Sequence, residues 1–142
     1  MAPLPQRLAG ARAMADGRRV LATAIEGKLG TRYTVDTLRL LLQRFPRVRF
    51  VWLMGADILP QLPRWRRWRE MLCTIAVAVL PRPGYNATAL NGQAAQIMRH
   101  CRRRDREAAT VPGQAPAWVF LHGPENPISA TAIRASRKGT VP

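Results

Sequence analysis

Three strongly apolar segments, separated by amphipathic stretches, are the feature that most constrains the fold of this chain. They are residues 48–55 (VRFVWLMG), 74–80 (TIAVAVL) and 117–123 (AWVFLHG). Each is rich in β-branched or aromatic residues and nearly free of polar ones, which is typical of a β-strand covered on both faces. Helical stretches between such strands serve as crossovers, and crossovers join parallel strands. The pattern therefore predicts an α/β fold built on a parallel sheet.

The stretches around these segments predict the other elements. We expect a first strand over residues 18–26 (RRVLATAIE) and helices over residues 5–16, 34–45, 64–72 and 87–107, with a last helix from residue 129. In the helix over 34–45, Thr34 is the expected N-cap, and an apolar face is expected to form the inner side. That face consists of Leu38, Leu41, Leu42 and Phe45.

Length, cysteine usage and hydropathy bound the class of protein. The chain has 142 residues, which corresponds to a single domain. Cys73 and Cys101 have neither CxxC spacing nor ligand pairs around them, so the sequence predicts no zinc site and no disulfide framework. No apolar run approaches the length needed to span a bilayer. We therefore expect a cytoplasmic protein that does not interact with membranes.

The charge balance favours an anionic partner. With 23 Lys and Arg against 8 Asp and Glu, the formal net charge is +15, which suits nucleotides, nucleic acid or phosphorylated metabolites. A coding bias toward arginine would produce the same excess. Charge alone leaves these alternatives open.

Polar residues follow the predicted strands at positions where the carboxyl ends of a parallel sheet form one edge, which is where ligands bind in such folds. Gly55 would let a ligand approach the backbone, and Asp57 would accept hydrogen bonds from a sugar or base. Both residues are also ordinary turn formers. Arg82 follows the strand over 74–80, and the stretch 129–134 follows the strand over 117–123. We expect these three groups to converge.

Two further groups of residues suggest how an anion could be held. Trp65 and Trp68 would share one face of the helix over 64–72, with Trp68 mainly packing and Trp65 exposed to a pocket beside arginines. In ISATAIR, the hydroxyls of Ser129 and Thr131 would lie beside free amides at a helix start, and Arg134 would reach the same anion. Simple capping by Ser129 is the alternative.

Four blocks together resemble the nicotinate-nucleotide adenylyltransferases of the nucleotidyltransferase superfamily. They are YTVDTLRLLLQRFP, FVWLMGADILPQLPRWRRWREM, VAVLPRPGY and PISATAIR, in the order and spacing of that family. The resemblance implies a Rossmann-like, three-layer fold with a parallel sheet. It also implies transfer of AMP from ATP to nicotinate mononucleotide, which yields deamido-NAD and pyrophosphate with the assistance of Mg²⁺.

The resemblance also implies roles for individual residues. Thr34, Thr37, Trp65 and Arg66 would bind the nicotinate nucleotide, with the ring of Trp65 stacked on the pyridine. Gly55, Asp57 and Arg82 would line the nucleotide site, while Ser129, Thr131 and Arg134 would hold the phosphates of ATP. No residue is implied to be a metal ligand, and neither His100 nor His122 is assigned to catalysis.

Two parts of the family pattern have no counterpart in the 142 residues. One is the GxFDPxHxGH segment, whose histidines face the α-phosphate in this family, and the other is the closing helix. The pattern thus predicts a single partial domain over residues 1–142 that lacks the first strands, or a start codon assigned too late, and it predicts that this chain contains no catalytic histidine. It also predicts that the strand over 48–55 has a bare edge.

Two other functions remain open at this point. A basic nucleic-acid-binding protein would use Arg64, Arg66, Arg67 and the arginines at 102–104 against phosphates. A phosphopantetheine or nicotinamide-nucleotide adenylyltransferase would belong to the same superfamily. The context of Trp65 and the GADxL block favour the nicotinate branch, so we do not expect nucleic acid to be the partner.

Overall fold

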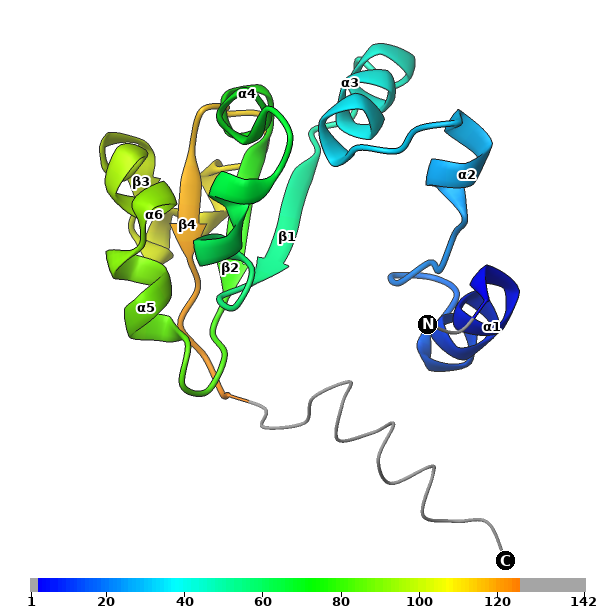
Figure 1. Ribbon diagram of the computed structural model, residues 1–142, viewed down its shortest axis with the longest axis horizontal. Coiled ribbons are helices and arrows are strands. Elements are labelled where there is room, and N and C mark those ends of the chain that lie inside the picture. Colours follow the sequence, from blue (N-terminus) through cyan, green and yellow to red (C-terminus); the bar gives the residue numbers. More distant parts are fainter. Residues whose placement is uncertain (1–2, 126–142) are drawn as a thin grey trace, which may run out of the picture.

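Short helices alternate with four strands in this computed structural model, which describes residues 3–125 (Figure 1). The α-helices are α1 (Leu4–Met14), α2 (Ile25–Leu29), α3 (Thr34–Arg44), α4 (Trp68–Thr74), α5 (Asn86–Asn91) and α6 (Gln93–Ile97). Three short 3₁₀ helices are η1 (Leu59–Arg64), η2 (Arg99–Cys101) and η3 (Asp105–Thr110). The strands are β1 (Val51–Gly55), β2 (Ala76–Leu80), β3 (Arg102–Arg103) and β4 (Trp118–Phe120).

The four strands form one parallel sheet in the order β1-β2-β4-β3. The register pairs Val51 with Ala76, and Val77 with Trp118. Their carboxyl ends therefore lie at one edge of the sheet. The prediction of an α/β fold with a parallel sheet is confirmed, and the arrangement is consistent with a Rossmann-like nucleotidyltransferase.

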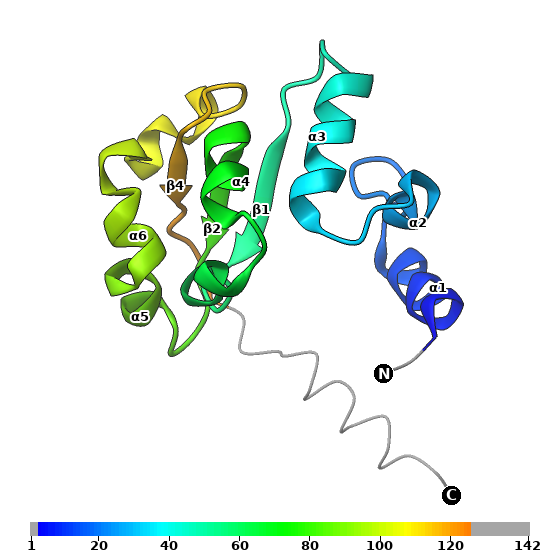
Figure 2. The same cartoon turned by 45° about the horizontal axis from the view of Figure 1, so that its top comes forward.

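The main core lies on the face of the sheet that α4, η1, α5 and α6 cover, and α3 packs against α4 beside β1 (Figures 1 and 2). Leu62 and Val79 are fully buried there, and Met71 is almost so. The opposite face has a smaller cluster, in which Val111 and Val119 pack beside η3. In residues 3–125 no helix is long and apolar enough to cross a membrane.

Strand β1 is covered less than the sequence predicts. The prediction of a strand buried on both faces over 48–55 is wrong, since pairing begins only at Val51 and the side chain of Leu53 is 57% exposed. Because β1 pairs with β2 alone among the strands of residues 3–125, its other edge is bare, as expected. The alternation of a strand then buries Met54 on the core side and leaves Leu53 outside.

The strand expected over residues 18–26 does not form. The carboxylate of Asp16 instead accepts hydrogen bonds from the backbone N–H groups of Val20, Arg18 and Arg19 at 2.8–2.9 Å, which folds these residues into a turn. These hydrogen bonds, that from Val20 foremost, lower the pKa of Asp16 below its ordinary value. Residues Ile25–Leu29 then form α2, and the apolar side chains of Val20 and Leu21 stay exposed.

The predicted N-terminal helix forms as α1, but it is not amphipathic in its packing. None of its residues is buried, and in both views it lies apart from the sheet (Figures 1 and 2). Its ends agree with the expected range to within a few residues.

Three predicted helices differ from those observed. Thr34 is the first residue of α3 rather than its N-cap, which is Tyr33, and Phe45 is 42% exposed beyond its end. Of residues 64–72, only those from Trp68 onward are α-helical. The stretch 87–107 is divided at Gly92 and again after α6, and two of its arginines form β3. The last predicted helix, from residue 129, lies outside the described residues.

Candidate functional site

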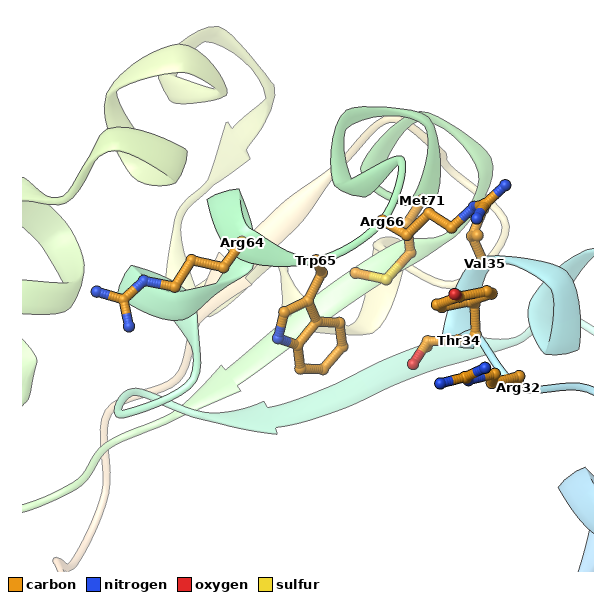
Figure 3. A pocket seen from close by; sticks show the side chains of 8 residues that line it. Arg32, Thr34, Val35, Arg64, Trp65, Arg66 and Met71 are labelled. Atoms are coloured by element: carbon orange, nitrogen blue, oxygen red, sulfur yellow. The ribbon is translucent and has the colours of Figure 1, made fainter.

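A cavity of about 260 Å³ opens between the start of α3 and the segment that joins η1 to α4 (Figure 3). Its lining contains three of the residues expected to bind the nicotinate nucleotide: Thr34, Trp65 and Arg66. The complete lining consists of Arg32, Tyr33, Thr34, Val35, Arg64, Trp65, Arg66 and Met71. Segments about 30 positions apart in the sequence thus meet here.

The backbone around Trp65 explains why this ring faces the cavity. Its N–H donates to the carbonyl of Leu62 at 2.8 Å, which closes η1, and its own conformation is extended. Leu62 is fully buried and so anchors this turn in the core. Because α4 begins only at Trp68, Trp65 and Trp68 do not share a helix face. Both rings are partly buried against the core, and of the two only Trp65 lines the cavity.

Tyr33 provides an aromatic wall that two arginines cover. The guanidinium carbon of Arg66 lies 4.7 Å from the centroid of the Tyr33 ring, and that of Arg32 lies 5.8 Å from it. These are cation–π distances. The guanidinium edges remain free to donate hydrogen bonds to an anion. In Figure 3 the guanidinium of Arg64 extends away from the Trp65 ring, so Arg66 and Arg32 are the arginines placed for such a role.

Arg67 ties the two walls of the cavity together. Its guanidinium forms an ion pair with Asp36 on α3, and its Nε lies 3.9 Å from Glu70 on α4. Arg39 on α3 pairs with the same Glu70. Arg67 is also the only non-glycine residue of the described chain with positive φ, at 51°. This left-handed conformation turns the chain between Trp65 and α4.

Two substitutions of Arg67 should separate its backbone role from its ion pair. Arg67→Ala removes the pairing with Asp36 but keeps a side chain in the left-handed region, whereas Arg67→Gly removes both the pairing and the strain. We expect Arg67→Gly to be more stable than Arg67→Ala by about 1 kcal/mol in urea denaturation. Equal stabilities would contradict the left-handed conformation at this position.

Thr37 lies outside the lining of the cavity. It is 4% exposed, and its hydroxyl makes a hydrogen bond of 2.6 Å with the hydroxyl of Thr31. Thr31 lies just before Arg32, so this contact holds the loop before α3 in place. A positioning role for Thr37 fits this geometry better than direct contact with a ligand.

A second group of residues lies at the carboxyl ends of β1 and β2, and we call it the Gly55 group: Gly55, Asp57 and Arg82. Arg82 Nε is 3.2 Å from Asp57 Oδ1, and both side chains lie beside Gly55. A side chain at Gly55 would collide with the Asp57 carboxylate and come within 3.1 Å of Arg82 Nε. A side chain at Gly55 would therefore displace this pair from its present position, although both atoms belong to flexible side chains. The backbone N–H of Arg82 also donates to Asn86 Oδ1 at 2.7 Å.

Other predicted residues are not brought to this edge or cannot be placed. Ser129, Thr131 and Arg134 lie outside the described residues. His122 pairs with Asp105 at 3.2 Å next to β3, and His100 is exposed in η2. Within residues 3–125 no three His, Cys, Asp or Glu side chains gather as a metal site would require.

Sequence reasoning missed Arg32, Tyr33 and Arg67 as parts of this site. Arg32 and Tyr33 directly precede Thr34, and this position is the signal that could have indicated them. No sequence signal indicates that Arg67 adopts a left-handed conformation, because that depends on where η1 ends and α4 begins.

Comparison with known proteins identifies relatives of high similarity. No protein-family model matches the chain. A protein of Gluconobacter oxydans is 56% identical over 137 residues, which cover 96% of this chain and 70% of the relative. One of Gluconacetobacter diazotrophicus is also 56% identical, over 96% of this chain and 64% of its own length. A protein of Methylorubrum extorquens is 48% identical over 94% of this chain and 73% of its own length.

All three relatives are named "Probable nicotinate-nucleotide adenylyltransferase". The match extends over nearly the whole chain, including the cavity and the Gly55 group, at an identity far above the level at which only a fold is shared. On this evidence the chain belongs to the nicotinate-nucleotide adenylyltransferase family of enzymes.

Proposed function

We propose that the cavity beside Trp65 binds nicotinate mononucleotide and that the Gly55 group binds ATP, for transfer of AMP between them. The observation that carries this proposal is that Trp65, Thr34 and Arg66 line one cavity. An aromatic ring suits a flat pyridine ring, and guanidinium groups suit its carboxylate and its phosphate. Thr34 adds a hydroxyl that can donate or accept a hydrogen bond.

The Gly55 group supports nucleotide binding in a different way. Because Gly55 has no side chain, Asp57 and Arg82 lie against the backbone there, and this pair offers a nucleotide an acceptor and a donor side by side. By the family resemblance, Ser129, Thr131 and Arg134 would hold the phosphates of ATP. In the proposed reaction a phosphate oxygen of nicotinate mononucleotide bonds to the α-phosphorus of ATP, and pyrophosphate leaves.

Such a transfer depends on positioning and on neutralisation of charge more than on a covalent nucleophile. Arg32, Arg66 and Arg82 would supply positive charge along the path between the two substrates. Mg²⁺ would neutralise further charge on the phosphates. Since residues 3–125 contain no cluster of metal-ligating side chains, we propose that it enters with ATP and assign no residue to it.

Replacement of Trp65 tests the assignment of the cavity. Trp65→Ala should weaken the binding of nicotinate mononucleotide in calorimetry by about 1–3 kcal/mol, or roughly fivefold to 150-fold, because the stacking surface is lost. Trp65→Phe retains a ring and should recover much of this affinity. The affinity for ATP should change little in either variant.

Two results would count against the proposal. If Trp65→Ala binds nicotinate mononucleotide as tightly as the unaltered protein, the cavity is not the binding site of this substrate. Tight, strongly salt-dependent binding of DNA, together with no detectable binding of ATP or nicotinate mononucleotide by the unaltered protein, would favour the nucleic-acid alternative. Chromatographic detection of deamido-NAD and pyrophosphate tests the reaction itself.

A further inference from the structure

A second, larger cavity lies at the opposite end of the sheet from β1. Its volume is about 390 Å³, and it is lined by Arg99, Arg102, Arg103, Arg104, Asp105, Phe120 and His122. β3 supplies two of these arginines, and the strand order places β3 at the far edge, beyond β4 and β2. We call this the arginine cavity. Nothing in the function proposed above uses it.

The charges around the arginine cavity are not balanced by the protein. Four arginines and one carboxylate, that of Asp105, line the cavity. A second carboxylate, that of Glu107, accepts the backbone N–H of Arg104 at 2.9 Å, so a surplus of two positive charges remains when it is counted. Asp105 is itself engaged, because its Oδ2 accepts the backbone N–H of His122 at 3.1 Å and lies 3.2 Å from the ring nitrogen of that residue. Within the described part of the chain, no carboxylate lies within ion-pair distance of the four guanidinium groups.

The arginine cavity is partly preorganised. The backbone of Arg102 and Arg103 is held by parallel pairing with Trp118 and Val119 of β4. The guanidinium carbon of Arg102 lies 5.3 Å from the centroid of the buried Trp118 ring. A guanidinium held over an aromatic ring keeps its N–H edge free, and that edge fits phosphate oxygens. Arginines that served only as a solvent-exposed charged surface would need neither the strand pairing nor the contact with Trp118.

The size of the arginine cavity points to a small ligand rather than a long polymer. Its volume falls in the usual range for small-molecule sites, whereas nucleic acid is held along an extended surface. We propose that the arginine cavity binds a di- or triphosphate chain, of an inorganic polyphosphate or of a nucleotide, at a site separate from the Trp65 cavity. Mutual repulsion among the arginines would be relieved by such a ligand.

Calorimetry with inorganic tripolyphosphate tests the proposal. The double variant Arg103→Gln, Arg104→Gln should bind tripolyphosphate at least about tenfold more weakly than the unaltered protein, because two charged hydrogen-bond donors are lost. Arg103→Lys with Arg104→Lys keeps the charge and should lose less. The matched control is Arg7→Gln with Arg12→Gln on α1, which removes the same charge from exposed positions and should change the affinity by less than about threefold.

Two comparisons separate the arginine cavity from the substrate site and identify the source of the phosphates. The Arg82→Gln variant should bind tripolyphosphate as the unaltered protein does, even if it loses ATP at the Gly55 group. The Arg82→Gln background also allows ATP and tripolyphosphate to be compared at the arginine cavity, as the part of each affinity that is lost when Arg103 and Arg104 are changed to glutamine. If ATP binds there more tightly than tripolyphosphate, the ligand is a nucleotide. If tripolyphosphate binds more tightly than ATP, the ligand is an inorganic polyphosphate.

The proposal is overturned if the Arg103, Arg104 glutamine variant binds tripolyphosphate as tightly as the α1 control. It is also overturned if a short DNA duplex binds more tightly than tripolyphosphate and depends on the same two arginines. Far-UV circular dichroism of each variant verifies that the fold is retained. None of these readouts depends on adenylyl transfer, so failure of the proposed function would be a separate result.

Discussion

Replacement of Trp118 by alanine is expected to lower the free energy of unfolding by about 3–5 kcal/mol. Trp118 is 4% exposed in β4, between β2 and β3, and its ring packs in the main core. Its indole N–H donates to the carbonyl of Met98 at 2.8 Å. Alanine would leave a large void and remove one of the two hydrogen bonds that the Met98 carbonyl accepts, the other coming from the backbone N–H of Cys101 at 3.0 Å. Both changes destabilise the fold, the void more than the lost hydrogen bond.

Urea denaturation followed by far-UV circular dichroism measures this effect without relying on tryptophan fluorescence. Trp118→Phe should cost less, about 1–3 kcal/mol, because a ring remains while the hydrogen bond to Met98 is lost. Tyr85→Ala is the control, since that side chain is half exposed and should change stability by less than about 0.5 kcal/mol. A Trp118→Ala protein as stable as this control would show that β4 does not form the centre of the core.

Addition of a single methyl group at Gly55 is expected to weaken ATP binding by about 1.5–3 kcal/mol, or roughly tenfold to a hundredfold. In Gly55→Ala the new carbon would displace the carboxylate of Asp57 and crowd Arg82. Both groups would move from their present positions, so the acceptor and donor that they present to a nucleotide would be rearranged together. Gly55 has no positive φ, so the backbone itself should tolerate alanine.

Calorimetric titration of ATP measures the effect, and Gly10→Ala provides the matched control. A side chain at Gly10 meets no atom within 4 Å, so ATP affinity should stay unchanged, and α1 should gain up to about 1 kcal/mol from the better helix former. If Gly55→Ala binds ATP as tightly as this control, Gly55 is not part of the nucleotide site.

The sheet was more predictable than the segments around it. Residues 75–80 are apolar throughout and include two valines and an isoleucine, which suits a strand covered on both faces; β2 (Ala76–Leu80) is that strand. Residues 18–26 contain a similar number of apolar residues but form no strand. A strand needs a neighbour with which to exchange backbone hydrogen bonds, and residues 3–125 provide none for this segment. The backbone N–H groups of Arg18, Arg19 and Val20 instead donate to the carboxylate of Asp16.

The stretch 87–107 shows a second limit of sequence reasoning. Its composition suits one long helix, but Gly92 interrupts it, and Arg102 and Arg103 pair with β4 instead. Charged residues in a two-residue edge strand carry no periodic signal that a sequence pattern could detect. The arginine cavity therefore became visible only when β3 was placed beside β4.

Trp65, Thr34 and Arg66 illustrate what each level of description contributes. The residue types were recognisable in the sequence, because aromatic, hydroxyl and guanidinium groups suit a nucleotide and occur in blocks typical of the family. The sequence thus determined the fold class, the family and the main chemical groups of the site. Their grouping depended on the buried Leu62 that anchors η1, on the left-handed Arg67 and on its ion pair with Asp36. Only the tertiary structure decided these contacts, because they join residues about 30 positions apart whose approach no local preference encodes.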